Sequence, residues 1–331
     1  MKRYYLGIGI LCCLIGLSSC SKDHFIEDKG GVYGTYYSVV YESQVDYGSS
    51  FDSIFEKINN AVSSYLPGSE VSAFNNNGLL KHPSPIFYEQ LKSADYYNRV
   101  TNGAFEPTLK TLIDVWGFGL KKRENIDSTR IDSLLKFVSF QKNISFNREA
   151  VKANKQGVTL SLTALGEGYT LNKIAAFLDK KGIKNYKVEL GGELKCHGKN
   201  PEGEIWKIGI ENPYYDSDNS QNELMGILKL NNSSLSTSGS YRKFYIDKNG
   251  RKRPHIIDPA TGYPVTHNLL SVSIKCKDAE KADAFATACM VMGAEKAQKF
   301  ISKNDEIEGF LIFENAEKKL KTWTSPGFFS A

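Results

Sequence analysis

The 331-residue sequence predicts a mixed α and β fold in one compact body with subdomains. Segments rich in β-branched and aromatic residues indicate strands, and residues 270–276 also alternate between apolar and polar side chains. Apolar residues that recur with a helical period indicate helices, as in residues 51–66. The chain has no Pro/Ser-rich linker, low-complexity tract or obvious repeat that would divide it into separate units.

Residues 1–20 have the pattern of a bacterial lipoprotein signal peptide. Two basic residues precede an apolar run over residues 4–17, and small residues then lead into Cys20. The run is shorter than the roughly 20 residues that span a bilayer. We expect Cys20 to carry the lipid, with several acyl chains giving stable anchoring. An ordinary secretory signal with an incidental cysteine is the alternative.

The signal predicts a protein of the bacterial cell envelope, anchored to the inner or outer membrane and lying outside the cytoplasm. Residues 21–30 are then expected to form a polar tether, and residues 31–331 the folded domain. The chain has 42 basic and 37 acidic residues, and two of the basic ones lie in the signal. This near-balance and the absence of long runs of like charge argue against a nucleic-acid partner.

Three cysteines remain after the signal: Cys196, Cys276 and Cys289. They are too few and too scattered for a disulfide framework or a zinc cluster. Cys276 and Cys289 fall on the apolar side of their segments, so we expect them in the core.

The first half of the chain begins with a predicted strand over residues 30–41, followed by a helix that ends at Pro67-Gly68. The next segment, SYLPGSEVSAFNNNG, is a loop with more hydrogen-bonding groups than a connector requires. Ser84-Pro85 begins another helix, and Pro107 begins a short one that Trp116-Gly117-Phe118-Gly119 closes.

The second half continues with a helix over residues 128–138 and a strand-turn-helix unit over residues 158–182. In that unit Gly166-Glu167-Gly168 supplies the turn and Gly182 ends the helix. The unit resembles a phosphate-binding site, but no dinucleotide fingerprint follows. Further elements are strands at 187–190, 205–211, 270–276, 309–314 and 319–324, a helix at 278–292 and a short helix after it.

Asn249-Gly250 lies between apolar-alternating segments and predicts a β-hairpin whose second strand leads into HIIDPATG. This stretch combines His255 with an aspartate and backbone-shaping residues. Either it is a rigid loop in which His255 caps a strand, or His255 has a chemical role. The basic patch KNGRKR over residues 248–253 fits a solvated turn or contact with an anionic ligand.

Asp283 and Thr287 lie four residues apart on the helix predicted over residues 278–292, which places a carboxylate and a hydroxyl on one face. Such a pair is often solvated. Here the neighbouring residues are apolar, so an oxygen-ligand site for Mg²⁺ is the other interpretation.

Several motifs in order along the chain resemble the FAD:protein FMN transferase family, the ApbE-like flavin transferases. They cover nearly the whole chain after the signal, and HIIDPATGYP with the preceding STSG is the most specific. The motifs are GTYYSV, SYLPGSEVSAFN, NGAFEPT with WGFG, ALGEGYTLNK, ELGGE with GKNPEG, STSGSYR, HIIDPATGYPV and DAFATACMVMG.

The resemblance implies an α+β fold, with a T-fold-like antiparallel sheet core, packed helices and a smaller α/β subdomain. It implies that FAD is the substrate and is bound with Mg²⁺. A threonine or serine hydroxyl of a partner attacks the phosphorus on the FMN side, and AMP leaves. The implied partner is an acceptor flavoprotein of a membrane redox complex or an extracytoplasmic reductase.

The family pattern maps the Mg²⁺ ligands onto Asp283, Thr287 and the backbone oxygen of Ala164. Its FAD contacts map onto Tyr33, Tyr65, Ala104, Phe105, Glu106, Ser161, Glu167 and Ile257. We further expect Ser238, Gly239 and Arg242 to hold phosphate oxygens. Since the usual pKa of histidine is near 6.5, His255 is the expected catalytic base, with Asp283 as the alternative.

The chain departs from the family at four of these or neighbouring positions. Ser161 stands where an aspartate is usual, Glu167 where a lysine is usual, Tyr33 for a methionine and Ala73 for an arginine. A carboxylate at Glu167 is expected to weaken FAD binding by repulsion unless a metal ion offsets it. Two other functions therefore stand beside transfer: hydrolysis of FAD to FMN and AMP, and flavin binding without catalysis.

Overall fold

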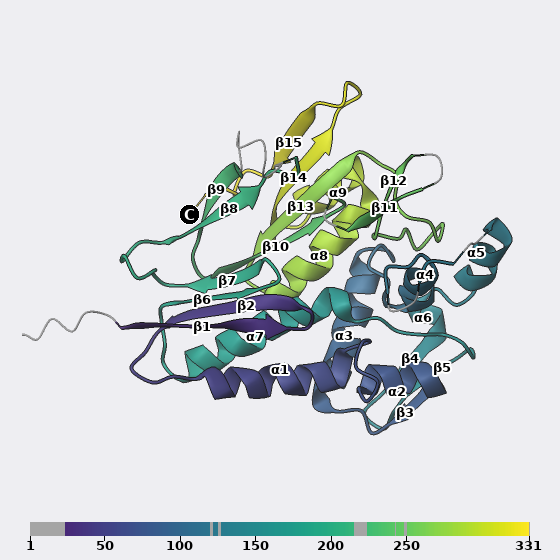
Figure 1. Cartoon of the computed structure of the whole chain (residues 1–331), viewed down its shortest axis with the longest axis horizontal. Helices are drawn as coiled ribbons and strands as arrows, with labels where there is room; N and C mark the ends of the chain where they lie inside the picture. The colour runs from purple at the N-terminus through teal and green to yellow at the C-terminus, as the bar shows by residue number, and fades with distance from the viewer. Residues whose placement is uncertain are drawn as a thin grey trace, which may run out of the picture.

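An eight-stranded sheet in which every neighbouring pair is antiparallel runs through the larger part of the molecule (Figure 1). The computed structural model describes residues 24–119, 122–124, 127–214, 224–241, 243–247 and 250–330. The sheet has the order β1-β2-β6-β7-β10-β13-β14-β15. Its strands are β1 (Phe25–Val32), β2 (Thr35–Glu42), β6 (Tyr186–Leu190), β7 (Glu193–His197), β10 (Ser233–Gly239), β13 (Leu269–Cys276), β14 (Glu308–Glu314) and β15 (Leu320–Thr324).

The first two strands correct two predictions. Residues 25–30 are not a tether, because they pair with β2 as part of β1. The single strand expected over residues 30–41 is a hairpin that turns at Tyr33 and Gly34, both with positive φ (55° and 81°). Tyrosine seldom adopts this conformation, so the alternation of side chains conceals the turn.

Two long helices, α7 (Thr163–Lys180) and α8 (Ala279–Met292), pack against each other and against strands of the large sheet. Helix α1 (Gly48–Val62) packs on α7, and α9 (Ala294–Ser302) on α8 and β14. The predicted helix boundaries at Asp278 and Gly182 are confirmed: Asp278 accepts hydrogen bonds from two N–H groups of α8, and Gly182 follows α7 with a φ of 79°. Cys276 and Cys289 are buried, as predicted.

The predicted turn at Gly166-Glu167-Gly168 is wrong, because all three residues lie inside α7. A Cβ on Gly168 would lie 2.4 Å from the backbone oxygen of Ala279, so the glycine allows α7 and α8 to approach closely. The strand expected before the turn is also absent: residues 158–162 belong to no strand or helix.

A smaller subdomain lies beside the sheet, where Figure 1 places α2 to α6 and the short strands β3 to β5. The polar loop predicted after α1 contains α2. Ser69 caps the N-terminus of α2, because its side chain accepts a hydrogen bond from Ser72 N–H. The helices are α2 (Glu70–Asn77), α3 (Pro85–Val100), α4 (Lys110–Val115), α5 (Ser128–Leu135) and α6 (Phe140–Asn143), with a 3₁₀ turn at Pro107–Leu109. The strands β3 (Leu79–Lys81), β5 (Ala150–Ala153) and β4 (Ile144–Phe146) pair in that order.

Two hairpins complete the described structure. Strands β8 (Trp206–Glu211) and β9 (Leu224–Leu230) pair with each other, as do β11 (Phe244–Ile246) and β12 (Lys252–Pro254). The second pair confirms the hairpin predicted around Asn249-Gly250. No helix among the described residues is long and apolar enough to cross a membrane. Residues 1–20 and the predicted lipidation site, Cys20, lie outside the described residues.

Glu280 on α8 forms a buried pair with Gln90 on α3. Gln90 donates from Nε2 to Glu280 Oε1 over 2.5 Å, while Gln90 Oε1 has no hydrogen-bond partner. Burial raises the pKa of Glu280 to about 7. A protonated Glu280 is therefore favoured at this site, because the neutral form avoids burying a charge.

We expect Glu280→Gln to make the protein more stable than the wild type above pH 7. The pKa of Glu280 is raised from 4.5 to about 7 by folding. The contribution of Glu280 to the free energy of unfolding is complete at pH values below its unfolded pKa. This contribution is lost as pH rises through 7, and the total loss is on the order of 3 kcal/mol. Urea unfolding at pH 5, 6, 7 and 8 measures this difference, with Glu56→Gln on the exposed side of α1 as the control. Equal pH profiles for Glu280→Gln and the wild type would contradict it.

Candidate active site

A cavity of about 410 Å³ lies where α7, α8, β10 and the end of the β11–β12 hairpin meet the smaller subdomain. It gathers predicted residues from five separate parts of the sequence. These are Ala104, Phe105, Glu106, Ser161, Ala164, Glu167, Ser238, Gly239, His255, Ile257, Asp283 and Thr287. Their convergence on one cavity is the main structural fact about the candidate site.

A second cavity of about 720 Å³ adjoins the first and shares Thr163, Glu167 and Lys243 with it. The other two predicted flavin contacts, Tyr33 and Tyr65, line this second cavity. The Tyr65 ring is half exposed, so a face of it is available to a flat ligand. Arg242 lies outside the described residues.

Asp283 and Thr287 project from adjacent turns of α8 into the first cavity. Asp283 is only 5% exposed and accepts a hydrogen bond from Gly168 N–H over 3.3 Å. The Thr287 hydroxyl lies 3.4 Å from the Ser238 hydroxyl on β10. Burial, and then the charge of Glu167, raise the pKa of Asp283 to about 8. The carboxylate form of Asp283 is thus unfavourable unless a positive charge is near.

Glu193 on β7 was not predicted as a site residue, yet it belongs to the same acidic group. Its Oε1 accepts from the Ser236 hydroxyl over 2.7 Å, and its buried Oε2 has no hydrogen-bond partner. Burial and the charges of Asp283 and Glu167 hold the pKa of Glu193 well above its usual range. Burial also raises the pKa of Glu167 to about 7. The motif ELGGE contained Glu193, but only the fold brings it beside Asp283.

This acidic group fits a divalent cation. Asp283 and Thr287 offer oxygen ligands, and Ala164 offers a backbone oxygen from the first turn of α7. Ala164 has a ψ of 17°, which is not helical and turns its carbonyl away from the helix direction. Oxygen ligands suit Mg²⁺. Among the described residues, no three His, Cys, Asp or Glu side chains are arranged to hold a metal ion, so the set rests on one carboxylate with two neutral oxygens.

His255 follows β12 and lines the first cavity. Its backbone N–H and its Nδ1 both lie within hydrogen-bond distance of Lys243 O, at 3.0 and 3.1 Å. Because a carbonyl oxygen only accepts, Nδ1 carries the hydrogen and Nε2 keeps the lone pair. Burial lowers the pKa of His255, which favours this neutral form. His255 therefore closes the hairpin and also presents a proton-accepting nitrogen.

The side chain of Glu106 has a structural role. Its carboxylate accepts from the backbone N–H and hydroxyl of Thr108, from Phe140 N–H and from Asn98. Phe105 is 2% exposed and belongs to the core. The predicted stretch at residues 104–106 thus contributes to the cavity wall while two of its side chains stabilise the fold beneath it.

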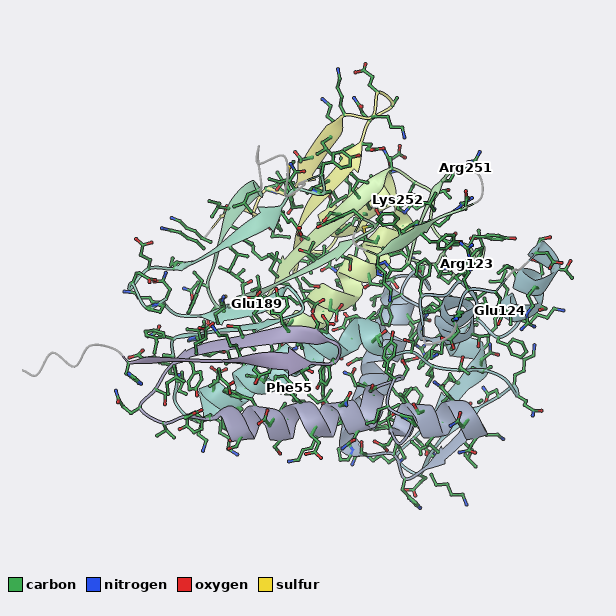
Figure 2. The ribbon with its side chains drawn as sticks, in the orientation of Figure 1. Phe55, Arg123, Glu124, Glu189, Arg251 and Lys252 are labelled. Carbon is green, nitrogen blue, oxygen red and sulfur yellow. The ribbon has the colours of Figure 1, made fainter. Side chains whose placement is uncertain are left out.

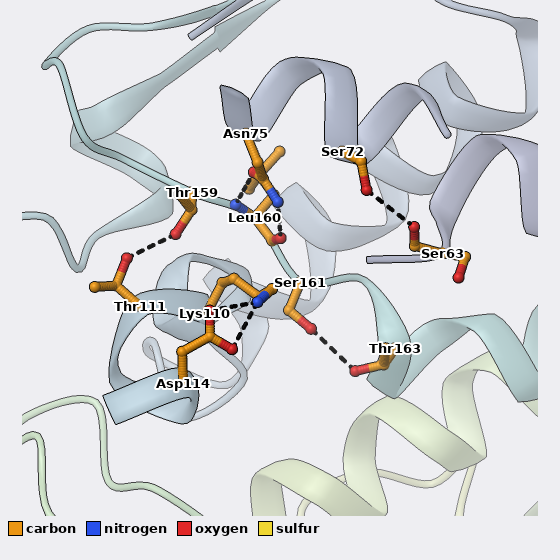
Figure 3. A network of polar contacts seen from close by, with 10 residues as sticks. All are labelled: Ser63, Ser72, Asn75, Lys110, Thr111, Asp114, Thr159, Leu160, Ser161 and Thr163. Atoms are coloured by element: carbon orange, nitrogen blue, oxygen red, sulfur yellow. Dashed lines mark hydrogen bonds and ion pairs between the residues drawn. The ribbon is translucent and has the colours of Figure 1, made fainter. Parts of the chain in front are cut away.

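A polar network holds the segment that carries Ser161 (Figure 3). Asn75 on α2 donates to Leu160 O over 2.9 Å and accepts from Leu160 N–H over 2.6 Å. The Ser161 hydroxyl lies 3.0 Å from that of Thr163. The hydroxyl of Thr159 forms a hydrogen bond with that of Thr111, which lies next to the largely buried ion pair of Lys110 and Asp114. These bonds explain why residues 158–162 are ordered without belonging to a sheet.

Comparisons with known proteins agree with the motifs. The model of the ApbE family matches residues 33–311. The chain is 31% identical to the FAD:protein FMN transferase of Haemophilus influenzae over 92% of each chain. It is 30% identical to that of Escherichia coli over 81% of this chain and 77% of the relative. The structure of the flavin transferase ApbE from Vibrio cholerae superposes with a TM-score of 0.82 and 27% identity, covering 92% of this chain and 98% of that one.

Proposed function

The chain belongs to the ApbE family and is a transferase that moves flavin to a protein. We propose that the reaction is Mg²⁺-dependent transfer of FMN from FAD to a Thr or Ser hydroxyl, with release of AMP. The observation that carries the proposal is the meeting of His255, Asp283 and Thr287 around one cavity that adjoins a second. Cavities of this size hold small-molecule ligands.

In the proposed reaction, the acceptor hydroxyl oxygen forms a bond to the phosphorus on the FMN side of the pyrophosphate. The bond from that phosphorus to the bridging oxygen breaks, and AMP leaves with this oxygen. His255 Nε2 takes the hydroxyl proton. Its Nδ1–H stays on Lys243 O, which keeps the ring oriented.

Asp283, Thr287 and the Ala164 carbonyl would hold Mg²⁺, which when bound neutralises charge on the pyrophosphate. Glu167 and Glu193 lie near these ligands, and a bound cation would favour their charged forms. The Ser238 hydroxyl and the backbone of Gly239 border the same cavity and are proposed to bind phosphate oxygens. The two tyrosines of the second cavity, Tyr33 and Tyr65, are proposed FAD contacts.

We further propose that the protein acts at the bacterial cell envelope, anchored to a membrane through Cys20. The acceptor is then a flavoprotein subunit of a membrane redox complex or an extracytoplasmic reductase. The sequence of residues 1–20 is the support for this location.

One assay tests transfer against its two alternatives. The full chain in detergent is incubated with FAD, Mg²⁺ and flavoprotein subunits from the envelope of the source organism. AMP is then measured, and fluorescence is sought on the acceptor after denaturing electrophoresis. AMP with a fluorescent acceptor supports transfer. AMP with free FMN indicates hydrolysis, and FAD binding without AMP indicates a binding protein.

A further inference from the structure

We propose that the outward face of the β11–β12 hairpin docks the flavin-accepting segment of the partner protein, and that this segment is acidic and carries apolar side chains. The proposal rests on the proposed function, since it concerns the acceptor of that reaction. We call the surface formed by Phe244, Ile246 and Lys252, together with the exposed Arg251 beside the hairpin turn, the hairpin face.

The position of the hairpin suits an acceptor. The two strands begin and end beside cavity residues, because Lys243 precedes β11 and His255 follows β12. Lys243 lines both cavities, and its Nζ donates to Phe118 O over 2.9 Å. The hairpin therefore lies next to the cavity that an acceptor hydroxyl has to reach.

The two faces of the hairpin differ in their packing. On the inner face, the Tyr245 ring stacks near Trp116 with centroids 6.5 Å apart and lies under the Arg123 guanidinium at 4.3 Å. Trp116 in turn donates to Gly262 O over 2.8 Å. The inner face is thus attached to the smaller subdomain and to the loop that follows His255, which makes the hairpin a supported surface.

On the outer face, apolar side chains are left in solvent. Phe244 is 42% exposed and Ile246 is 56% exposed, and they project to the same side because they are two residues apart on β11. Lys252, opposite Ile246 on β12, places its Nζ 3.9 Å from the centre of the Phe244 ring. Both strands pair only with each other among the described strands, so their outer edges also offer backbone groups to an extended segment.

The charge of the hairpin indicates the chemistry of the partner. Residues 243–255 contain five basic residues and one acidic residue, Asp247. Asp247 forms an ion pair with Arg253 at 2.8 Å, on the side away from Phe244 and Ile246. Arg251 and Lys252 are exposed at the hairpin end of the molecule (Figure 2). A basic rim with apolar side chains is complementary to an acidic segment with apolar residues.

Two double variants test the hairpin face in the full chain: Phe244→Ser with Ile246→Ser, and Arg251→Glu with Lys252→Glu. The matched control is Ile227→Ser with Lys229→Glu, which changes an exposed apolar residue and an exposed lysine on β9. The probe is the acceptor protein that the wild type flavinylates. We expect each hairpin variant to raise the acceptor KM at least about ten-fold, with kcat and FAD affinity unchanged. The control is expected to match the wild type.

A second readout is salt dependence. The acceptor KM of the wild type is expected to rise with NaCl, and that of Arg251→Glu with Lys252→Glu to fall or stay level. An unchanged acceptor KM in both hairpin variants overturns the proposal. So does a weaker FAD affinity in the charge-reversal variant with an unchanged acceptor KM, which would assign the basic residues to FAD. If the wild type binds FAD and flavinylates no acceptor, the proposed function itself fails and the docking proposal falls with it.

Discussion

Replacing His255 with alanine is expected to lower the rate of FMN transfer by about 10²- to 10⁴-fold while FAD remains bound, because the acceptor hydroxyl loses its base. The tautomer set by Lys243 O leaves Nε2 as the proton acceptor. Flavin fluorescence titration measures FAD binding, and single-turnover AMP release measures transfer. Since burial lowers the pKa of His255, the acid limb of the wild-type rate profile should lie below the usual value near 6.5.

His255→Asn separates the two roles of the histidine. Its amide can still donate to Lys243 O and close the hairpin, but it provides no base at neutral pH. We expect the asparagine variant to match the alanine variant in transfer and the wild type in stability. Imidazole added to the alanine variant is expected to restore part of the rate. Full transfer by His255→Asn would move the base role elsewhere, with Asp283 as the next candidate.

Replacing Asp283 with asparagine is expected to abolish the response to Mg²⁺ and to lower transfer by about two orders of magnitude or more. The substitution removes the one carboxylate of the proposed ligand set, and a bound cation contributes several kcal/mol by stabilising charge on the pyrophosphate. Calorimetric titration of Mg²⁺ in the presence of FAD measures the binding, and AMP release at increasing Mg²⁺ measures the rate.

The fold is expected to tolerate Asp283→Asn. Burial raises the pKa of Asp283 to about 8, so the fold already favours a neutral group there, and an amide oxygen can still accept from Gly168 N–H. An unchanged melting temperature checks this point. Thr287→Ser, which keeps the hydroxyl, serves as the control on the same helix. An asparagine variant with the Mg²⁺ dependence of the wild type would show that the cation lies elsewhere.

Local signals in the sequence were sufficient for elements that depend on their own residues. Ser84 accepts from Phe87 N–H at the start of α3, and the Asn249-Gly250 signal marked the β11–β12 hairpin. The prediction failed where tertiary contacts decide. Gly166 and Gly168 looked like a turn, but both lie within α7, and Gly168 is a glycine there because α8 passes too close for a Cβ. Residues 25–30 looked like a tether because their polar side chains conceal a strand on the sheet edge.

The sequence by itself determined which reactive residues are present and in what order they occur, because motifs such as HIIDPATG and DAFATA consist of neighbouring residues. Their joint environment was decided only by the tertiary structure. Glu167, Glu193 and Asp283 come from α7, β7 and α8, and each carboxyl is ordinary by itself. Burial raises the pKa of all three, because it removes water from each group, and the charge of Glu167 raises the pKa values of Asp283 and Glu193 further. No sequence pattern contains that burial or those distances, and both arise only when the helices pack on the sheet.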